Sequence, residues 1–149
     1  MNNFRIIQLT NTSIGAVAED TYMPLGVITR RINGKCADNI KRTFSTASNG
    51  IDVVTINECG YYKITYSANV VAEAAGIVTL SLQVNSSTVY TVSATVAAGD
   101  TVNLTLPFEI RLLPNCQGVI NNLPANIQIL LGGVALTDGN TNLIVERNY

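Results

Sequence analysis

The sequence predicts an all-β domain, an antiparallel jelly-roll sandwich of about eight strands with an extended N-terminal arm. Three observations predict this fold class. Stretches of alternating apolar and polar residues recur along the chain, turn residues separate them at short intervals, and no stretch shows the apolar period of an amphipathic helix. Alternation indicates strands with one buried face, which is typical of antiparallel sheets. Strands of this number and spacing indicate a sandwich or barrel.

The N-terminal segment, residues 1–35, is predicted to be separate from a jelly-roll domain over residues 36–149. Its apolar residues are scattered among Asn, Thr and Gln, which gives neither a helical nor a clear strand period. Such an arm either packs along its own domain or docks on another protein. If it docks, the side chains that we expect to make the attachment are Phe4, Arg5, Ile6, Ile7, Leu9 and Ile14.

The clearest strand begins at Gly60 and runs through residues 60–71. The side chains on one face are Tyr62, Ile64, Tyr66, Ala68 and Val70, and those on the other are Lys63, Thr65, Ser67 and Asn69. A period of two in aromatic and β-branched residues marks a strand with one buried face. We therefore expect this strand to cross the middle of a sheet.

The other predicted strands are separated by Gly, Asn, Asp and Ser clusters, which favour turns. They cover residues 51–56, 77–84, 88–96, 101–112, 126–136 and 142–149, with a turn at 137–140 between the last two. Pro107 interrupts the third-last of these, 101–112. Because proline removes a hydrogen-bond donor from the ladder, this strand is predicted to have an edge or a bulge there.

The composition limits the classes of function. Of 149 residues, 47% are hydrophobic and only 13% are charged, and the net charge is −1. Two interpretations of the low charge stay open: a large subunit interface, or a β-domain with a Thr, Ser and Asn surface. No overall positive field attracts nucleic acid or membrane, and no apolar run is long enough to span a bilayer. We therefore expect neither as a partner.

A local basic cluster also has two interpretations. Five of the nine basic residues lie within thirteen positions: Arg30, Arg31, Lys35, Lys41 and Arg42. They form either a surface for an anionic partner or a solvated loop. No aromatic residues are interleaved for stacking on bases, which favours the solvated loop.

The residues for common catalytic chemistry are absent. The chain has no histidine, so it lacks histidine-based triads and the commonest metal ligand. Cys36, Cys59 and Cys116 lack zinc-site spacing, and we expect free thiols in a reducing compartment, a Cys59–Cys116 bridge being the alternative. The diglycine Gly132-Gly133 has no phosphate-loop spacing and indicates a bulge or a close backbone approach. We expect no cofactor, no metal and no enzyme.

One segment resembles a known family. The run from Gly60 to Ala68, with Tyr62, Ile64 and Tyr66, resembles the Gly-x-Tyr-x-Phe-x-Tyr strand of C1q/TNF-like jelly rolls, with isoleucine where that family often has phenylalanine. Residues 98–104 look like that family's turn into its sixth-strand region, and residues 142–147 are similar to the last strand of its bacterial members. The resemblance implies a compact homotrimer that acts as a head or fibre module. The side chains that we expect at the trimer interface are Tyr61, Tyr90 and Tyr149.

The chain departs from the collagen-stalked members of that family. No Gly-X-Y repeat precedes the domain, and the N-terminus lacks a secretion signal. A jelly roll with a short arm is similar to phage head-fibre and decoration proteins, including the trimeric head fibres of crAss-like phages. We therefore expect a structural virion protein, assembled in the host cytoplasm and attached to the capsid by its arm. The alternative is a module of a phage fibre or spore surface that binds a host glycan or receptor.

Overall fold

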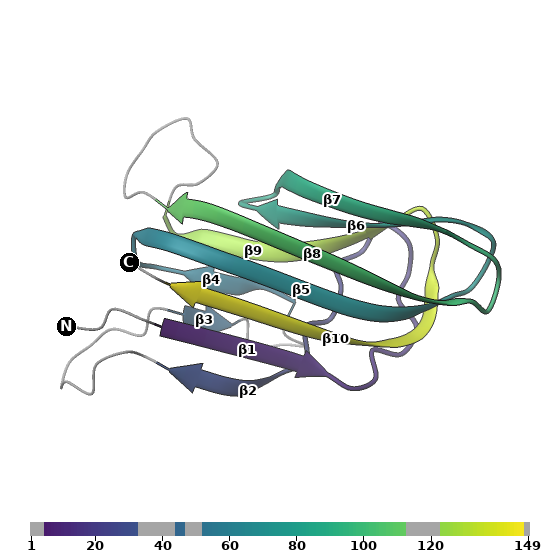
Figure 1. Cartoon of the computed structure of the whole chain (residues 1–149), viewed down its shortest axis with the longest axis horizontal. Coiled ribbons are helices and arrows are strands. Elements are labelled where there is room, and N and C mark those ends of the chain that lie inside the picture. Colours follow the sequence, from purple (N-terminus) through teal and green to yellow (C-terminus); the bar gives the residue numbers. More distant parts are fainter. Residues whose placement is uncertain (1–4, 33–43, 47–51, 113–122, 148–149) are drawn as a thin grey trace.

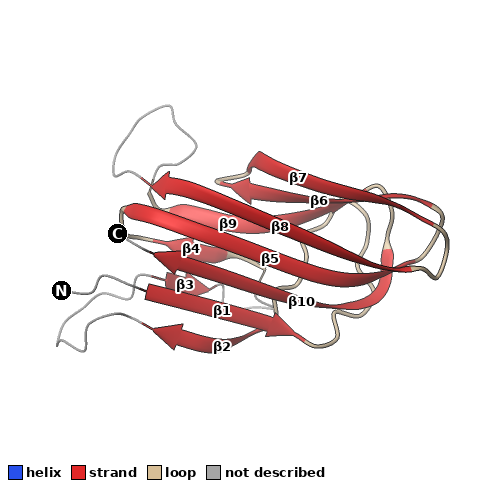
Figure 2. Cartoon of the chain, viewed as in Figure 1, coloured by secondary structure: helices blue, strands red, loops and turns tan. Residues whose placement is uncertain are grey.

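A computed structural model describes residues 5–32, 44–46, 52–112 and 123–147 of the chain. These residues form ten strands and no helix (Figure 2). The strands make two five-stranded sheets that face each other across a common core (Figure 1). The predicted all-β antiparallel sandwich is confirmed, with ten strands among the described residues in place of about eight.

The first sheet contains the longest strands. Its order is β2–β1–β10–β5–β8, and every neighbouring pair is antiparallel. The strands are β1 (Arg5–Asn11), β2 (Val27–Ile32), β5 (Gly60–Ala72), β8 (Thr101–Leu112) and β10 (Leu136–Arg147). β8 lies at one edge, as the proline in its sequence predicts, because Pro107 pairs with Thr65 of β5 and has no second neighbour in the sheet.

The second sheet has the order β3–β4–β9–β6–β7 and is also antiparallel throughout. Its strands are β3 (Phe44–Thr46), β4 (Val54–Ile56), β6 (Gly76–Val84), β7 (Ser87–Val96) and β9 (Ala125–Gly132). β7 is its edge strand on the side where the first sheet ends in β8, and the two edge strands contact each other. The sandwich therefore has one margin formed by β7 and β8.

The core lies between the inner faces of the two sheets. The inward side chains of β5 are fully buried: Tyr62, Ile64, Tyr66, Ala68 and Val70. Opposite them in the second sheet, β6 and β9 contribute fully buried aliphatic side chains at alternate positions: Val78, Leu80, Leu82, Ile127, Ile129 and Leu131. The alternation in the sequence thus corresponds to which side chains face the other sheet.

The N-terminal segment is not a separate arm in the described structure. β1 lies inside the first sheet, paired with β10 on one side and with β2 on the other. Ile7 and Leu9 are completely buried in the core, and the segment between β1 and β2 bridges to β9 and β10 through Tyr22 and Val17. Of the two interpretations of the arm, packing along its own domain therefore describes residues 5–32.

The last turn of the chain also lies elsewhere than predicted. Residues 137–140 belong to β10, which begins at Leu136, and the chain reverses at the diglycine instead. Gly133 has a φ of 84°, and a side chain there would collide with the Ile77 carbonyl. The predicted close backbone approach therefore exists at this glycine, in a turn between β9 and β10.

Candidate functional site

The margin formed by β7 and β8 is where the core is least covered. Core-facing side chains are completely buried in the central strands, but along β7 and much of β8 they are only partly buried. We call these residues, together with the exposed Tyr90 of β7, the β7–β8 seam: Val89, Val92 and Ala94 of β7 with Val102, Phe108 and Ile110 of β8. The seam is an apolar strip, open to solvent, along one long side of the sandwich.

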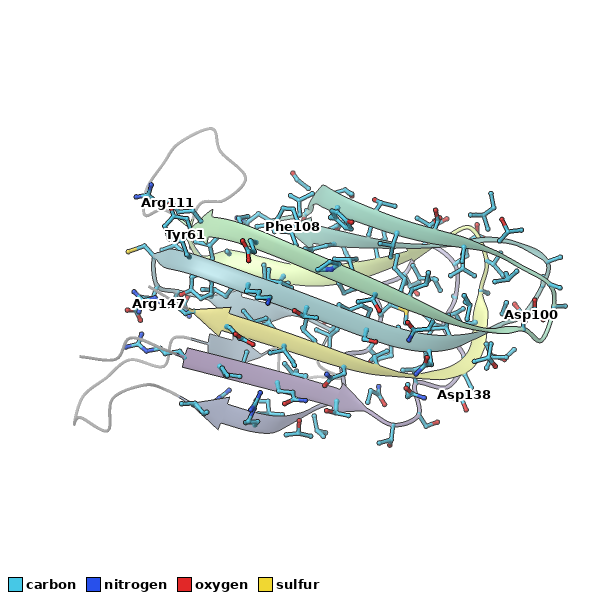
Figure 3. The ribbon with its side chains drawn as sticks, viewed as in Figure 1. Tyr61, Asp100, Phe108, Arg111, Asp138 and Arg147 are labelled. Atoms are coloured by element: carbon cyan, nitrogen blue, oxygen red, sulfur yellow. The ribbon has the colours of Figure 1, made fainter. Side chains whose placement is uncertain are left out.

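Aromatic rings lie on both sides of β8. Tyr90 is 40% exposed, and its ring centroid lies 6.0 Å from that of Phe108 at an interplanar angle of 52°. On the outer face of the first sheet, the Arg111 guanidinium lies 5.4 Å from the centroid of the Tyr61 ring, which is 51% exposed (Figure 3). The structure thus places two of the predicted interface tyrosines, Tyr61 and Tyr90, on opposite faces of β8, and Tyr149 lies outside the described residues.

A second exposed apolar group lies on the opposite edge of the first sheet. It consists of Val27, Ile28 and Ile32 of β2, which we call the β2 patch. Arg30 and Arg31, from the predicted basic cluster, belong to the same strand. The other three members of that cluster lie outside the described residues. The described basic pair therefore lies on an edge strand, where charge discourages uncontrolled strand pairing.

The side chains predicted to attach the chain to a capsid are mostly unavailable for contact. Ile6, Ile7 and Leu9 are buried, and Ile14 is partly buried against the core. Arg5 is directed to the ion pair described next, and Phe4 lies outside the described residues. Because β1 is an inner strand, Ile7 and Leu9 cannot leave the core without opening the sheet.

An ion cluster joins three segments that are far apart in the sequence. Glu58, in the turn before β5, pairs with Arg5 at the start of β1 and with Arg147 at the end of β10, the second pair at 3.3 Å. The Arg147 Nε also donates to the Cys59 carbonyl at 3.1 Å, and the Tyr62 hydroxyl donates to the Glu58 carbonyl at 2.6 Å. The sequence predicts the turn and the strands but not which of their ends meet, so it does not predict this cluster. Its geometry indicates a structural clamp.

Cys59, beside this cluster, is exposed and carries no disulfide. Cys36 and Cys116 lie outside the described residues. Within the described ranges, no group of His, Cys, Asp and Glu could hold a metal ion, and no helix could cross a membrane.

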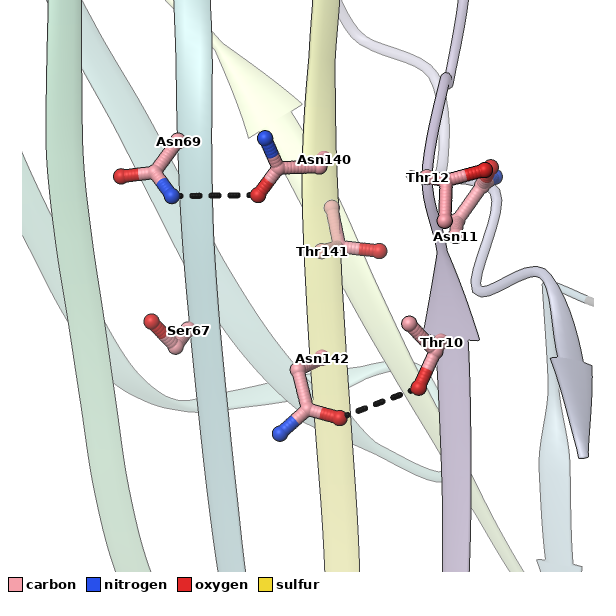
Figure 4. Close-up of a pocket in the computed structure, with 8 residues that line it drawn as sticks. All are labelled: Thr10, Asn11, Thr12, Ser67, Asn69, Asn140, Thr141 and Asn142. Carbon is pink, nitrogen blue, oxygen red and sulfur yellow. Dashed lines mark hydrogen bonds between the residues drawn. The ribbon is translucent and has the colours of Figure 1, made fainter. Parts of the chain in front are cut away.

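The outer face of the first sheet carries a shallow pocket that sequence reasoning also missed. Its volume is about 400 Å³, and eight residues with amide or hydroxyl side chains line it (Figure 4). They come from three separate segments: Thr10, Asn11, Thr12, Ser67, Asn69, Asn140, Thr141 and Asn142. We call this the amide pocket. None of its lining residues is charged, aromatic or aliphatic, so it is not suited to a phosphate or to an apolar cofactor.

The comparisons with solved structures show the fold of the chain. No protein-family model matches the chain, and no curated protein does so. Among solved structures, murine APRIL superposes with a TM-score of 0.67 at 10% identity over 97% of this chain and 98% of that chain. The globular domain of zebrafish complement 1qA follows with 0.60 at 10% identity over 93% and 94%. The fold is a C1q/TNF-like jelly roll.

A vertex protein has the same jelly roll. PRD1 vertex protein P5 superposes with a TM-score of 0.64 at 16% identity, over 100% of this chain and 99% of that chain. At these identities the likeness shows the fold alone. The C1q/TNF-like jelly roll thus occurs here without a matching family model, and a fold that carries many functions does not by itself define the function of this chain.

Proposed function

We propose that this chain is a non-enzymatic structural module of a virion, a head fibre or decoration knob that assembles as a homotrimer through the β7–β8 seam. The open seam carries the proposal. Its half-buried apolar side chains leave a strip of the core in contact with water, and covering apolar surface contributes about 25 cal/mol for each Å². A second copy of the chain is the occupant that we propose.

A ring of three needs two unlike patches on each copy, because each subunit meets its neighbours head to tail. The β7–β8 seam and the β2 patch supply such a pair, since they lie at opposite edges of the first sheet. The low charge of the chain, 13% of residues, supports a surface that is partly covered by neighbours. The resemblance to C1q/TNF-like jelly rolls also implies a homotrimer.

The virion role is supported by the full-length likeness to a vertex protein. We also propose that the chain attaches to another virion protein. Surface residues would make this contact, because the apolar side chains of β1 are buried. Antibodies raised against the purified chain should label intact particles from the source culture in electron microscopy. Label on membranes or free in the medium, with unlabelled particles, would contradict the virion role and leave the trimer untouched.

The role of the seam as the subunit interface is tested by introducing one negative charge on β7, either within the seam or on the opposite face of the strand. Tyr90→Glu puts a carboxylate into the seam, whereas Ser93→Glu adds the same charge at an exposed position on the same strand. Tyr90→Glu should dissociate the assembly and Ser93→Glu should not, as read from the mass by light scattering. Val27→Glu should have the effect of Tyr90→Glu if the β2 patch is the partner surface. Equal masses for Tyr90→Glu and Ser93→Glu would contradict the seam as the interface.

A further inference from the structure

The amide pocket presents hydrogen-bond donors that the protein does not use. Asn140 accepts a hydrogen bond from Asn69 Nδ2 at 3.0 Å, and Asn142 accepts from Gln8 Nε2 at 2.8 Å and from Thr10 Oγ1 at 3.3 Å. Within the described ranges, the Nδ2 groups of Asn140 and Asn142 donate to no protein atom (Figure 4). The carboxamide oxygens are engaged, and the N–H groups are left for a ligand.

The direction of these donors is fixed by a relay across three strands. The Thr105 hydroxyl donates to Asn103 Oδ1 at 3.2 Å, and Asn103 Nδ2 donates to Asn69 Oδ1 at 2.8 Å. Asn69 in turn donates to Asn140, at which the relay ends. Every amide oxygen in the relay already accepts a hydrogen bond from its neighbour on the β8 side. Each Nδ2 group is therefore directed away from β8, toward β10. The pocket is therefore preorganised as a donor surface.

Further polar groups border these amides. The hydroxyls of Ser67 and Thr12 line the pocket and have no partner among the described residues, and Ser67 pairs in register with Asn142. The Thr141 side chain, between the two amides on β10, faces the core, because it pairs in register with the buried Ala68, so its hydroxyl is not offered to a ligand. Amide and hydroxyl groups without net charge match a neutral ligand that is rich in oxygen acceptors.

We propose that the amide pocket is a binding site for neutral saccharides. A saccharide supplies ring, hydroxyl and acetamido oxygens to the Asn140 and Asn142 donors, and its own hydroxyls can donate to the remaining lone pairs. An anion would find no cationic side chain in the pocket, and an apolar ligand would find no aromatic or aliphatic side chain to pack against. Because water competes for every one of these groups, the affinity per site is expected near about 1 mM.

This proposal does not rest on the homotrimer. If three copies assemble with their pockets open to solvent, a surface that presents many saccharide chains is held through several weak contacts at once, which raises the overall affinity. A monomer would bind a single oligosaccharide equally well at each pocket. The mass of each sample is therefore measured beside its saccharide affinity, so that loss of assembly and loss of binding are separate results.

The test is an NMR titration of the ¹⁵N-labelled full chain with chitotriose and with maltotriose, with sodium acetate as the anionic comparison. We expect saturable shifts of the Asn140 and Asn142 side-chain NH₂ signals with at least one saccharide and no such shifts with acetate. Asn140→Asp and Asn142→Asp replace the donor by an acceptor, and each should weaken binding by about tenfold or more. Asn57→Asp makes the same change in the exposed turn before β5 and should leave the affinity unchanged.

Ser67→Ala is the milder variant, which removes one pocket hydroxyl with little risk to the fold, and it should weaken binding by a smaller factor. Thermal unfolding of each variant shows whether the sheet is intact. The proposal is overturned by the absence of saturable shifts with both saccharides, by equal shifts with acetate, or by affinities of the folded pocket variants that match that of Asn57→Asp.

Discussion

The rings of Tyr90 on β7 and Phe108 on β8 lie with their centroids 6.0 Å apart and tilted by 52°, so an aromatic pair joins the edges of the two sheets. Both rings remain partly exposed. The pair therefore packs the two sheets together at this margin. It also presents apolar area that a neighbouring molecule can cover.

The first prediction concerns the energy of this pair. A double-mutant cycle of Tyr90→Ala and Phe108→Ala should give a coupling free energy of about 0.5–1.5 kcal/mol, the usual range for tilted aromatic pairs. Chemical unfolding, carried out at concentrations low enough to exclude association, measures it. Strictly additive effects would show that the two rings do not interact in the isolated domain.

The second prediction concerns the clamp made by Glu58 with Arg5 and Arg147. Glu58→Gln removes the carboxylate and leaves two guanidinium groups facing an uncharged amide, whereas Glu73→Gln makes the same change in an exposed turn. The Glu58 side chain is 37% exposed, so water screens the pairs and the expected cost in unfolding free energy is about 1 kcal/mol. An equal effect of the two substitutions would contradict the role of the clamp.

The third prediction separates two buried tyrosines. The Tyr62 hydroxyl donates to the Glu58 carbonyl, whereas the Tyr66 hydroxyl lies in the core without a hydrogen bond of good geometry. Tyr62→Phe should lower the unfolding free energy by about 1 kcal/mol, and Tyr66→Phe should leave it nearly unchanged or raise it, because no made bond is lost. Urea unfolding of the two variants measures the difference, and the reverse order would contradict the assignment.

These tyrosines also predict an alkaline limit to stability. Burial raises the pKa of Tyr62 and of Tyr66 above the ordinary value, and the positive charge of Arg147 opposes the rise at Tyr62. Stability is fully present below the unfolded pKa of about 10 and is lost as pH rises from there through the folded values. Absorbance at the tyrosinate band should therefore rise together with unfolding for these two residues. Ionisation of all tyrosines in a fully folded chain would contradict this.

The fifth prediction concerns Asp138, which accepts hydrogen bonds from the Ser13 hydroxyl and the Gly15 backbone amide at 3.1 and 3.2 Å. The backbone amides of Gly139 and Gly15, and then the Ser13 hydroxyl, hold the pKa of this carboxyl below its usual range. A lowered pKa stabilises the fold above the unfolded value of about 3.9 and loses that effect as pH falls through the folded value.

Asp138→Asn should therefore melt at a lower temperature than the natural chain near about pH 6, with the difference shrinking toward about pH 2. Glu19→Gln, an exposed change in the same part of the fold, should melt like the natural chain at both values. A pH-independent difference for Asp138→Asn would mean that ionisation of this group is not involved.

The fold class was predictable because the inner faces of the long strands are almost purely apolar. Tyr62, Ile64 and Tyr66 alternate with polar residues over the whole of β5, and a period of two indicates a strand with one buried face. β1 was harder to recognise as a sheet strand, because Ile6 next to Ile7 breaks the alternation that continues through Leu9. The turn predicted at residues 137–140 was wrong because Asp and Asn, common in turns, here lie along β10, where Asp138 accepts hydrogen bonds from the loop that follows β1.

The amide pocket and the ion clamp could not be predicted from the sequence for a different reason. Each joins residues from three segments: Thr10 with Asn69 and Asn142 in the pocket, and Arg5 with Glu58 and Arg147 in the clamp. Which of these meet depends on the register between β1, β10 and β5. A slip by one residue would turn every one of these side chains to the other face. The sequence specifies the alternation within a strand, but the register is defined only once the strands are paired.

The solution mass of the purified natural chain tests the central claim most directly. Light scattering over a range of concentrations should give three times the 15.9 kDa of one chain, with the mass falling for Tyr90→Glu and unchanged for Ser93→Glu. A mass of 15.9 kDa at every concentration would contradict the homotrimer and would leave the open β7–β8 seam as the edge of a monomeric jelly roll.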